Sequence, residues 1–157
     1  MKKLIIVFAV LFLMTTPAFA GFKEGEEAYN KGDYVAALHE LRPLAEEGDA
    51  QAQYHLGIMY AGGLGVRKDY AETVQWFKKA AKQGFTKAQN DIGVMYYIGY
   101  GVPKDYVLSY MWLNIANVNQ DNKAARELLN DLEKAMTPAQ IAEAQRLSRE
   151  FKVDKKN

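Results

Sequence analysis

The chain has 157 residues, with 20 basic and 19 acidic side chains, two histidines and no cysteine. This length suffices for one domain with a buried core, and the near balance of charge argues against a nucleic-acid-binding surface. The absence of cysteine excludes disulfide bonds and lipid attachment to a cysteine side chain.

The first twenty residues are predicted to be a secretory signal peptide. Lys2 and Lys3 precede an apolar run of 11 residues, and Ala18, Phe19 and Ala20 match the small-residue cleavage pattern. A membrane-anchoring helix is the alternative, but a membrane span needs about 20 residues. We therefore expect cleavage after Ala20, a periplasmic or secreted mature chain of residues 21–157, and membrane contact only through the signal peptide.

A repeat with a period of 36 residues follows. Residues 52–80 and 88–116 are identical at 13 of 29 aligned positions, and a shorter copy precedes them, in which four residues of a glycine-rich loop are missing. Such a period predicts a stack of repeats, which we place at residues 22–48, 49–84 and 85–120. The identical positions are Ala52, Gln53, Gly57, Met59, Tyr60, Gly63, Gly65, Val66, Lys68, Asp69, Tyr70, Trp76 and Ala80.

Each repeat is predicted to contain two helices, because apolar residues recur at helical spacing. In the second repeat, Asp49 is the expected N-cap of the first helix. Asp69 is the expected N-cap of the second helix, with Glu72 completing a capping box and Gly84 ending the helix in a left-handed conformation. Pro43 falls inside the second helix of the first repeat, where we expect a kink.

The loop between the two helices of a repeat raises the question of a phosphate site. Residues 59–70 read MYAGGLGVRKDY and residues 95–106 read MYYIGYGVPKDY. A nucleotide-binding loop follows a strand and opens a helix, whereas this loop follows a helix and occurs twice.

Gly57 and Gly93 fall inside helices, which costs about 1 kcal/mol each unless a neighbouring helix approaches there. Positive φ is expected in the loops at Gly63, Gly65, Gly99 and Gly101.

These residues resemble a known family. From Ala52 to Ala81 the chain reads A-x-x-x-L-G-x-M-Y-x-x-G-x-G-V-x-K-D-Y-x-x-x-x-x-W-x-x-x-A-A, which is similar to the Sel-one-like repeat, a relative of the tetratricopeptide repeat. The third repeat fits as well but has Asn117 in place of the last Ala. The resemblance covers roughly residues 22–120. It implies an all-α, right-handed α-solenoid of helix-turn-helix repeats, and adaptor scaffolds for protein complexes as the usual function.

Residues 121–152 are predicted to form two further helices that cap the open end of the stack. Thr137, Pro138 and Gln140 provide an N-cap, a favoured first position and a capping box for the second of them. The alternative is an amphipathic helix that binds a partner. Residues 153–157 are expected to be a frayed tail. The apolar stripe of the first helix consists of Ala125, Leu128, Leu129, Leu132 and Met136.

Signals for catalysis, metals and cofactors are weak. Ser109 and Ser148 do not begin an S-x-x-K motif. His39 and His55 lack the spacing of metal ligands, and we expect both at the solvated surface. We therefore predict no enzymatic activity, no metal and no cofactor. The alternative function is an envelope hydrolase, β-lactamase-like or acting on peptidoglycan, because some cysteine-rich proteins related to the repeat family carry a β-lactamase label. A chaperone-like holder of exported chains is a third possibility.

The concave face of the stack is the predicted binding surface, since the first helix of each repeat usually lines it. Tyr97 and Tyr100 add aromatic surface nearby, which is favoured at binding hot spots. We predict a noncatalytic protein-interaction adaptor, monomeric or weakly oligomeric, that binds a protein and no nucleic acid. The candidate contact residues are Gln51, Tyr54, His55, Ile58, Lys87, Asn90, Asp91 and Val94.

Overall fold

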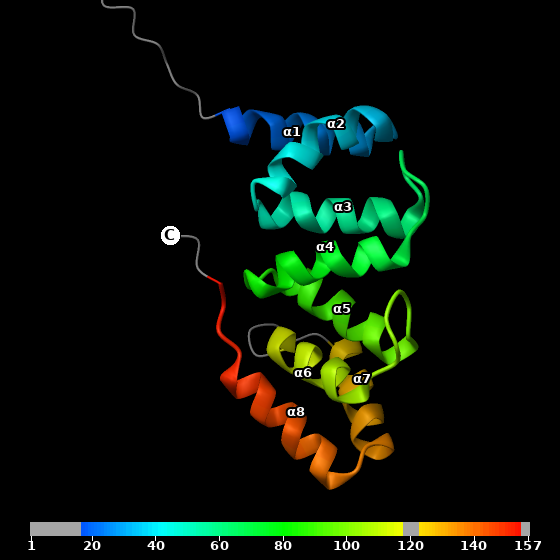
Figure 1. The fold of residues 1–157 in the computed structure, drawn as a ribbon, viewed down its shortest axis with the longest axis vertical. Coiled ribbons are helices and arrows are strands. Elements are labelled where there is room, and N and C mark those ends of the chain that lie inside the picture. Colours follow the sequence, from blue (N-terminus) through cyan, green and yellow to red (C-terminus); the bar gives the residue numbers. More distant parts are fainter. Residues whose placement is uncertain (1–16, 118–122, 155–157) are drawn as a thin grey trace, which may run out of the picture.

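The computed structural model describes residues 17–117 and 123–154, and every regular element in these two ranges is a helix (Figure 1). Most of the predicted signal peptide lies outside the described residues, and the cleavage position after Ala20 falls within the first helix. The helices are α1 (Pro17–Asn30), α2 (Tyr34–Glu46), α3 (Ala50–Gly62), α4 (Tyr70–Lys82), α5 (Thr86–Ile98), α6 (Tyr106–Asn117), α7 (Lys123–Ala135) and α8 (Pro138–Glu150).

The helices pair into hairpins that stack one below another in Figure 1. Helix α1 packs on α2, α3 on α4, and α5 on α6, while α3 also packs on α2 and α5 on α4. The predicted all-α solenoid is therefore confirmed. In the described part of the chain, no helix has the length and apolar character that crossing a bilayer requires.

Aspartates begin α3 and α4, as predicted, whereas the N-cap of α5 is Phe85, without a side-chain cap. The Asp49 carboxylate accepts a 2.7 Å hydrogen bond from the main chain three residues later, and the Asp69 carboxylate accepts two, at 2.9 and 3.1 Å. The capping box expected at Asp69 does not form, because the Asp69 N–H that Glu72 would bind already donates to the carbonyl of Tyr60 (3.0 Å). Pro43 lies inside α2, which continues past it to Glu46.

Glycines in the left-handed conformation follow α3, α4 and α5. Gly84 has a φ of +86° and follows the last residues of α4. There the N–H of Phe85 donates to the carbonyl of Ala80 (3.1 Å) and that of Gly84 donates to Ala81 (3.0 Å), which is a Schellman motif. The φ values of the loop glycines confirm the structural interpretation of these loops; they are +70° at Gly63, +68° at Gly65, +82° at Gly99 and +71° at Gly101.

Gly57 and Gly93 let the two helices of a repeat approach each other. A Cβ atom at Gly57 would lie 2.4 Å from the Phe77 ring of α4, and one at Gly93 would lie 2.8 Å from the Leu113 side chain of α6. Both distances are shorter than real Cβ contacts, so a larger residue would force the helices apart. The expected close approach at these two positions is confirmed.

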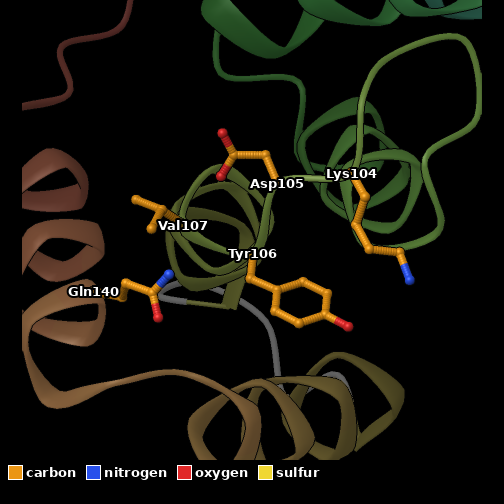
Figure 2. A pocket seen from close by; sticks show the side chains of 5 residues that line it. All are labelled: Lys104, Asp105, Tyr106, Val107 and Gln140. Atoms are coloured by element: carbon orange, nitrogen blue, oxygen red, sulfur yellow. The ribbon is translucent and has the colours of Figure 1, made fainter.

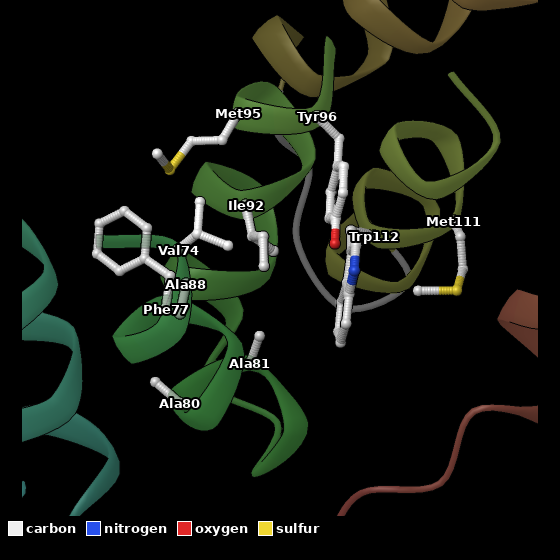
Figure 3. Close-up of a cluster of buried hydrophobic side chains, with 10 residues drawn as sticks. All are labelled: Val74, Phe77, Ala80, Ala81, Ala88, Ile92, Met95, Tyr96, Met111 and Trp112. Atoms are coloured by element: carbon white, nitrogen blue, oxygen red, sulfur yellow. The ribbon is translucent and has the colours of Figure 1, made fainter. Parts of the chain in front are cut away.

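The core between the second and third repeats comes from three helices, α4, α5 and α6 (Figure 3). Val74 and Phe77 of α4 meet Ile92 of α5, and Trp112 of α6 closes the cluster. The equivalent tryptophan, Trp76, packs in the preceding cluster, with residues of α2 and α3. Each tryptophan thus fills space between successive hairpins, and burial of each large apolar side chain contributes about 1.5–3 kcal/mol.

The last two helices both pack on α6 and cover the end of the stack. Leu132 of α7 and Ala144 of α8 are buried there together with Leu113 of α6. Helix α8 begins with the predicted capping box, in which the Gln140 N–H donates to the Thr137 hydroxyl (3.3 Å) and the Thr137 N–H donates to the Gln140 side chain (2.9 Å).

Residues 151–154 follow α8 and include the first two residues of the expected tail at 153–157, the rest of which lies outside the described residues. They run back along the stack, towards the level of α4 (Figure 1). The Phe151 ring meets the Trp112 ring edge-on at 5.2 Å, and the Asp154 N–H donates to the carbonyl of Lys82 (2.8 Å). A carbonyl in the last turn of a helix has no partner within its own helix. The segment therefore satisfies the end of α4 and covers Trp112, and we call residues 151–154 the C-terminal strap.

Candidate functional site

The site is built on Tyr54, which projects from α3. Its ring stacks on Phe77 of α4, with 5.3 Å between ring centroids, and lies 5.0 Å from Phe85, which precedes α5. The Tyr54 hydroxyl donates a 2.9 Å hydrogen bond to Oδ2 of Asp91 on α5. The aromatic contacts fix the position of the hydroxyl, so this hydrogen bond ties the second repeat to the third.

A cavity of about 110 Å³ opens beside this hydrogen bond, and we call it the Asp91 cavity. Helix α5 supplies most of its polar lining, α3 supplies Tyr54, and α6 and α7 supply one small side chain each. Four of the predicted contact residues therefore converge on one place. The lining residues are Tyr54, Thr86, Lys87, Asn90, Asp91, Ala116 and Ala125.

The half-buried carboxylate of Asp91 dominates the electrostatics of the cavity. Burial raises the pKa of Asp91, while hydrogen bonds from Tyr54 and Asn90 and the more distant Lys87 ammonium act in the opposite direction. Burial and the negative charge of Asp91 together raise the pKa of the Tyr54 hydroxyl, which therefore stays protonated as the donor. In the described ranges, no lysine or arginine forms an ion pair with Asp91.

The predicted surface position of His55 is wrong. It was expected at the solvated surface, but its ring is half-buried in a cluster of aromatic side chains next to the cavity. Phe22 and Tyr29 of α1 lie 5.6 and 5.5 Å from the His55 ring, and Tyr54 lies at 6.3 Å. Burial lowers the pKa of His55, so the neutral ring is favoured. His39 is at the surface as expected, with 83% of its side chain exposed.

The other predicted contact residues divide into two kinds. Gln51 is exposed on α3, and its side chain is not part of the cavity lining. Ile58 packs against the core of α4 and α5, and Val94 packs against the cluster of α6, α7 and α8. Sequence reasoning missed the lining residues Thr86, Ala116 and Ala125. Thr86 lies one turn before Asn90 on α5, which was a usable signal, whereas nothing in the sequence places the two alanines opposite Asp91.

Two buried glutamines were also missed as interacting residues. The Gln53 side-chain amide donates to the carbonyl of Ala45 near the end of α2, and the Gln89 amide donates to Ala81 near the end of α4, both at 3.0 Å. Their recurrence 36 residues apart was visible in the sequence. Each glutamine ties the first helix of a repeat to the last turn of the preceding repeat.

A larger and more open cleft of about 540 Å³ lies between the start of α6 and the start of α8 (Figure 2). Asp105 and Gln140 contribute to its lining, but Asp105 accepts a 2.9 Å hydrogen bond from the Leu108 N–H and Gln140 completes the capping box of α8. Both side chains therefore cap the N-terminus of a helix. Tyr100, predicted as accessible aromatic surface, is half exposed and stacks on Tyr70 at 5.0 Å.

Both serines lie on helices outside the Asp91 cavity. Ser109 is 0% exposed inside α6, and the Ser148 hydroxyl donates to the main-chain carbonyls of Ala144 (2.9 Å) and Met111 (3.3 Å). Within the residues that the structure describes, no group of three or more metal-ligating side chains is assembled. Four of the eight predicted contact residues thus line a polar recess between repeats, and neither serine belongs to its lining.

Comparisons with known proteins agree with the fold. A family model described as the Sel1 repeat matches residues 50–85 and 86–121. The chain is similar to a protective antigen of uropathogenic Escherichia coli strains that displays an SLR fold, at 34% identity and a TM-score of 0.79 over 85% of this chain and 29% of that one. It is also similar to a Sel1 repeat protein from Oxalobacter formigenes, at 38% identity and a TM-score of 0.64 over 73% and 88% of the two chains. A search of curated proteins gave no match.

Proposed function

The chain belongs to the Sel1 repeat family, whose members are generally protein-interaction scaffolds, and we propose that it is an exported, noncatalytic adaptor that binds a protein partner at the Asp91 cavity. Export rests on the predicted signal peptide. The adaptor acts as a monomer or weak oligomer, without nucleic acid, and contacts the membrane only through the signal peptide before cleavage.

The fixed geometry of Tyr54 and Asp91 is the observation that carries this proposal. Their 2.9 Å hydrogen bond joins two repeats, and the stacked rings of Phe77 and Phe85 hold the Tyr54 side chain in place. A partner that binds there would not have to order these groups, so less conformational entropy is lost on binding. Preorganised aromatic and polar groups at the centre of a surface are typical of binding hot spots.

Site-specific photo-crosslinking in the native cell tests the proposal. A photoreactive residue replaces Lys87, which is exposed at the rim of the cavity, and in a matched control it replaces Gln75, which is exposed on α4. The partner captured at position 87 but not at position 75 is identified, purified and titrated against the protein. We expect Tyr54→Ala and Asp91→Ala to weaken this binding at least about tenfold. Equal capture at both positions, or unchanged affinity in both variants, would contradict the proposal.

Two further measurements address the rest of the proposal. Mass spectrometry of the protein isolated from the cell envelope should give a mature N-terminus at Gly21; an intact leader would contradict cleavage.

Turnover of a β-lactam or of peptidoglycan by the purified protein tests the hydrolase alternative. Activity that survives purification and is lost in Ser148→Ala would overturn the noncatalytic assignment, whereas the adaptor proposal predicts no turnover above that of a mock preparation.

A further inference from the structure

The Asp91 carboxylate lacks a cationic partner within the described residues, although it is half-buried. The groups that support it are the Tyr54 hydroxyl and the Asn90 side chain, and both are neutral. A carboxylate withdrawn from water is normally paired with a positive charge. Hydrogen bonds from neutral groups offset only part of the loss of hydration, as the raised pKa of Asp91 indicates.

Lys87 does not fill this role. It lies one turn before Asp91 on α5, but its side chain is exposed and forms no ion pair with the carboxylate. Its electrostatic influence on Asp91 is weaker than that of burial and of the two hydrogen bonds. The charge of Asp91 therefore remains available to a group that enters the cavity from outside.

The dimensions of the cavity limit what can enter. Its volume is about 110 Å³, and a single water needs about 10–15 Å³ of such space. The space thus accommodates the end of one long side chain but not a cofactor. Ala116 and Ala125 form the small-residue side of the cavity. At the equivalent position of the preceding repeat, His55 is instead enclosed by the rings of Phe22 and Tyr29.

We propose that the Asp91 cavity is a specificity pocket for a cationic side chain, lysine or arginine, of the bound protein. The proposal rests on the proposed function and names the chemistry that the partner presents. The ammonium or guanidinium group donates to the Asp91 carboxylate, and the aliphatic stem of the side chain lies against Ala116 and Ala125. The Tyr54 hydroxyl holds the carboxylate in position, and the rings of Phe77 and Phe85 hold Tyr54.

The experiment uses small probes and the purified protein, so that it does not depend on the identity of the partner. Nα-acetyl-lysine methylamide and Nα-acetyl-arginine methylamide are titrated at low salt, and Nα-acetyl-norleucine methylamide is the uncharged control with a matching stem. Nuclear magnetic resonance follows the side-chain carboxyl carbon of Asp91 and the ring of Tyr54. We expect saturable shifts with at least one cationic probe and no saturable shift with the norleucine probe.

Two variants make the test specific. Asp91→Asn keeps an acceptor for Tyr54 but removes the charge, and binding of the cationic probe should weaken about tenfold or more. Lys87→Gln removes the nearby positive charge, and the same probe should bind about threefold more tightly. Asp131→Asn changes an exposed carboxylate on α7 that pairs with Lys134, and it should leave binding unchanged. The melting temperature of each variant shows that it is folded.

The outcomes separate this inference from the proposed function. Equal responses to the lysine and norleucine probes, or an unchanged response in folded Asp91→Asn, would overturn the specificity pocket. If crosslinking at position 87 still captures a partner in that case, the adaptor proposal stands and only the cationic chemistry is wrong. If the cationic probes bind as expected but no partner is captured, the cavity is a cation-binding site, and its role in binding a protein fails together with the adaptor proposal.

Discussion

Gln53 and Gln89 show how single residues lock successive repeats together. Both side chains are almost completely buried, and each amide donates to a main-chain carbonyl near the end of the preceding helix. Each of these carbonyls also accepts a hydrogen bond from a main-chain N–H just after its helix, that of Gly48 for Ala45 (3.1 Å) and that of Gly84 for Ala81 (3.0 Å), so the glutamine is a second donor from the next repeat. The two glutamines are therefore part of the interface between repeats, although a polar residue at this position looks like a solvated one in the sequence.

Replacing Gln89 by leucine tests this role. The side chain keeps a similar size, but one buried hydrogen bond between the repeats is lost, so we expect the free energy of unfolding to fall by about 0.5–1.5 kcal/mol. The carbonyl of Ala81 keeps the Gly84 N–H as a donor. Urea denaturation measures the change. Gln75→Leu is the matched control, because Gln75 is exposed on α4, and its effect should stay within about 0.5 kcal/mol. A Gln89→Leu protein as stable as the unaltered one would refute the role.

His55 predicts a dependence of stability on pH. Its pKa is lowered, mainly by burial, with a smaller contribution in the same direction from the Lys87 ammonium; the carboxylates of Glu26 and Asp49 oppose the shift. A group whose pKa is lowered by folding stabilises the protein above its unfolded value and loses this contribution as pH falls through the folded value. The unfolded value is 6.5. The free energy of unfolding should therefore decrease as the protein is acidified below pH 6.5.

His55→Gln should reduce this acid loss, because glutamine does not titrate. His39→Gln is the control, since that ring is exposed, and its profile should follow that of the unaltered protein. Asp91 acts with the opposite sign: its raised pKa contributes stability at low pH that is lost as the pH rises through the folded value. Thermal unfolding of the unaltered protein and the variants, measured across the acid range, separates the contribution of His55 from that of Asp91. An unchanged acid loss in His55→Gln would contradict the assignment to His55.

The sequence predicted residues that act within their own helix or turn, and missed those whose partners lie elsewhere. The Asp49 cap and the positive φ of Gly84 follow from local rules, and both are confirmed. His55 was assigned to the surface because the rings that enclose it come from α1, which lies about 30 residues earlier in the chain. Part of the cavity lining was missed for the same reason, since Ala116 and Ala125 come from α6 and α7.

The C-terminal strap makes contacts that the sequence analysis did not predict. Its contacts join Phe151 to Trp112 and Asp154 to Lys82, so its partners lie far back in the chain. No periodicity or capping signal reports such contacts, whereas the capping box of α8 needed only Thr137 and Gln140 and was predicted. A solenoid element normally packs on its neighbours alone, and the strap adds a contact that bypasses α5 and reaches α4.

Phe151→Ala should loosen the strap. The ring is half-buried, so we expect a loss of about 1–2 kcal/mol in the free energy of unfolding, less than the 3–5 kcal/mol typical of a fully buried phenylalanine. Loss of the ring also uncovers Trp112, and acrylamide quenching of tryptophan fluorescence should increase. Lys152→Ala alters an exposed neighbour in the same segment and should change neither quantity. If Phe151→Ala behaves like Lys152→Ala, the strap does not contribute to stability.

At the scale of the whole molecule, the period of 36 residues was sufficient to predict a stack of hairpins. Small residues at the contacts, such as Gly57 against Phe77, explain why the stack is close-packed. Each hairpin packs mainly on the next one along the chain, so stability is distributed along the solenoid instead of being concentrated in one core. The ends of such a stack are coupled only through the repeats between them.

This distribution makes opposite ends of the molecule separable by mutation. Leu41 in α2 and Leu132 in α7 are both fully buried, and replacing either by alanine should cost about 2–5 kcal/mol. In native-state hydrogen exchange, Leu41→Ala should lower amide protection in α1, α2 and α3 and leave α8 unchanged, because sub-global opening follows packed units. Leu132→Ala should lower protection in α6, α7 and α8 and, through the strap, at the end of α4, while α1 and α2 stay unchanged. An equal loss of protection in all helices for both variants would mean that the described helices open as one cooperative unit, and the one-dimensional account of this stack would be wrong.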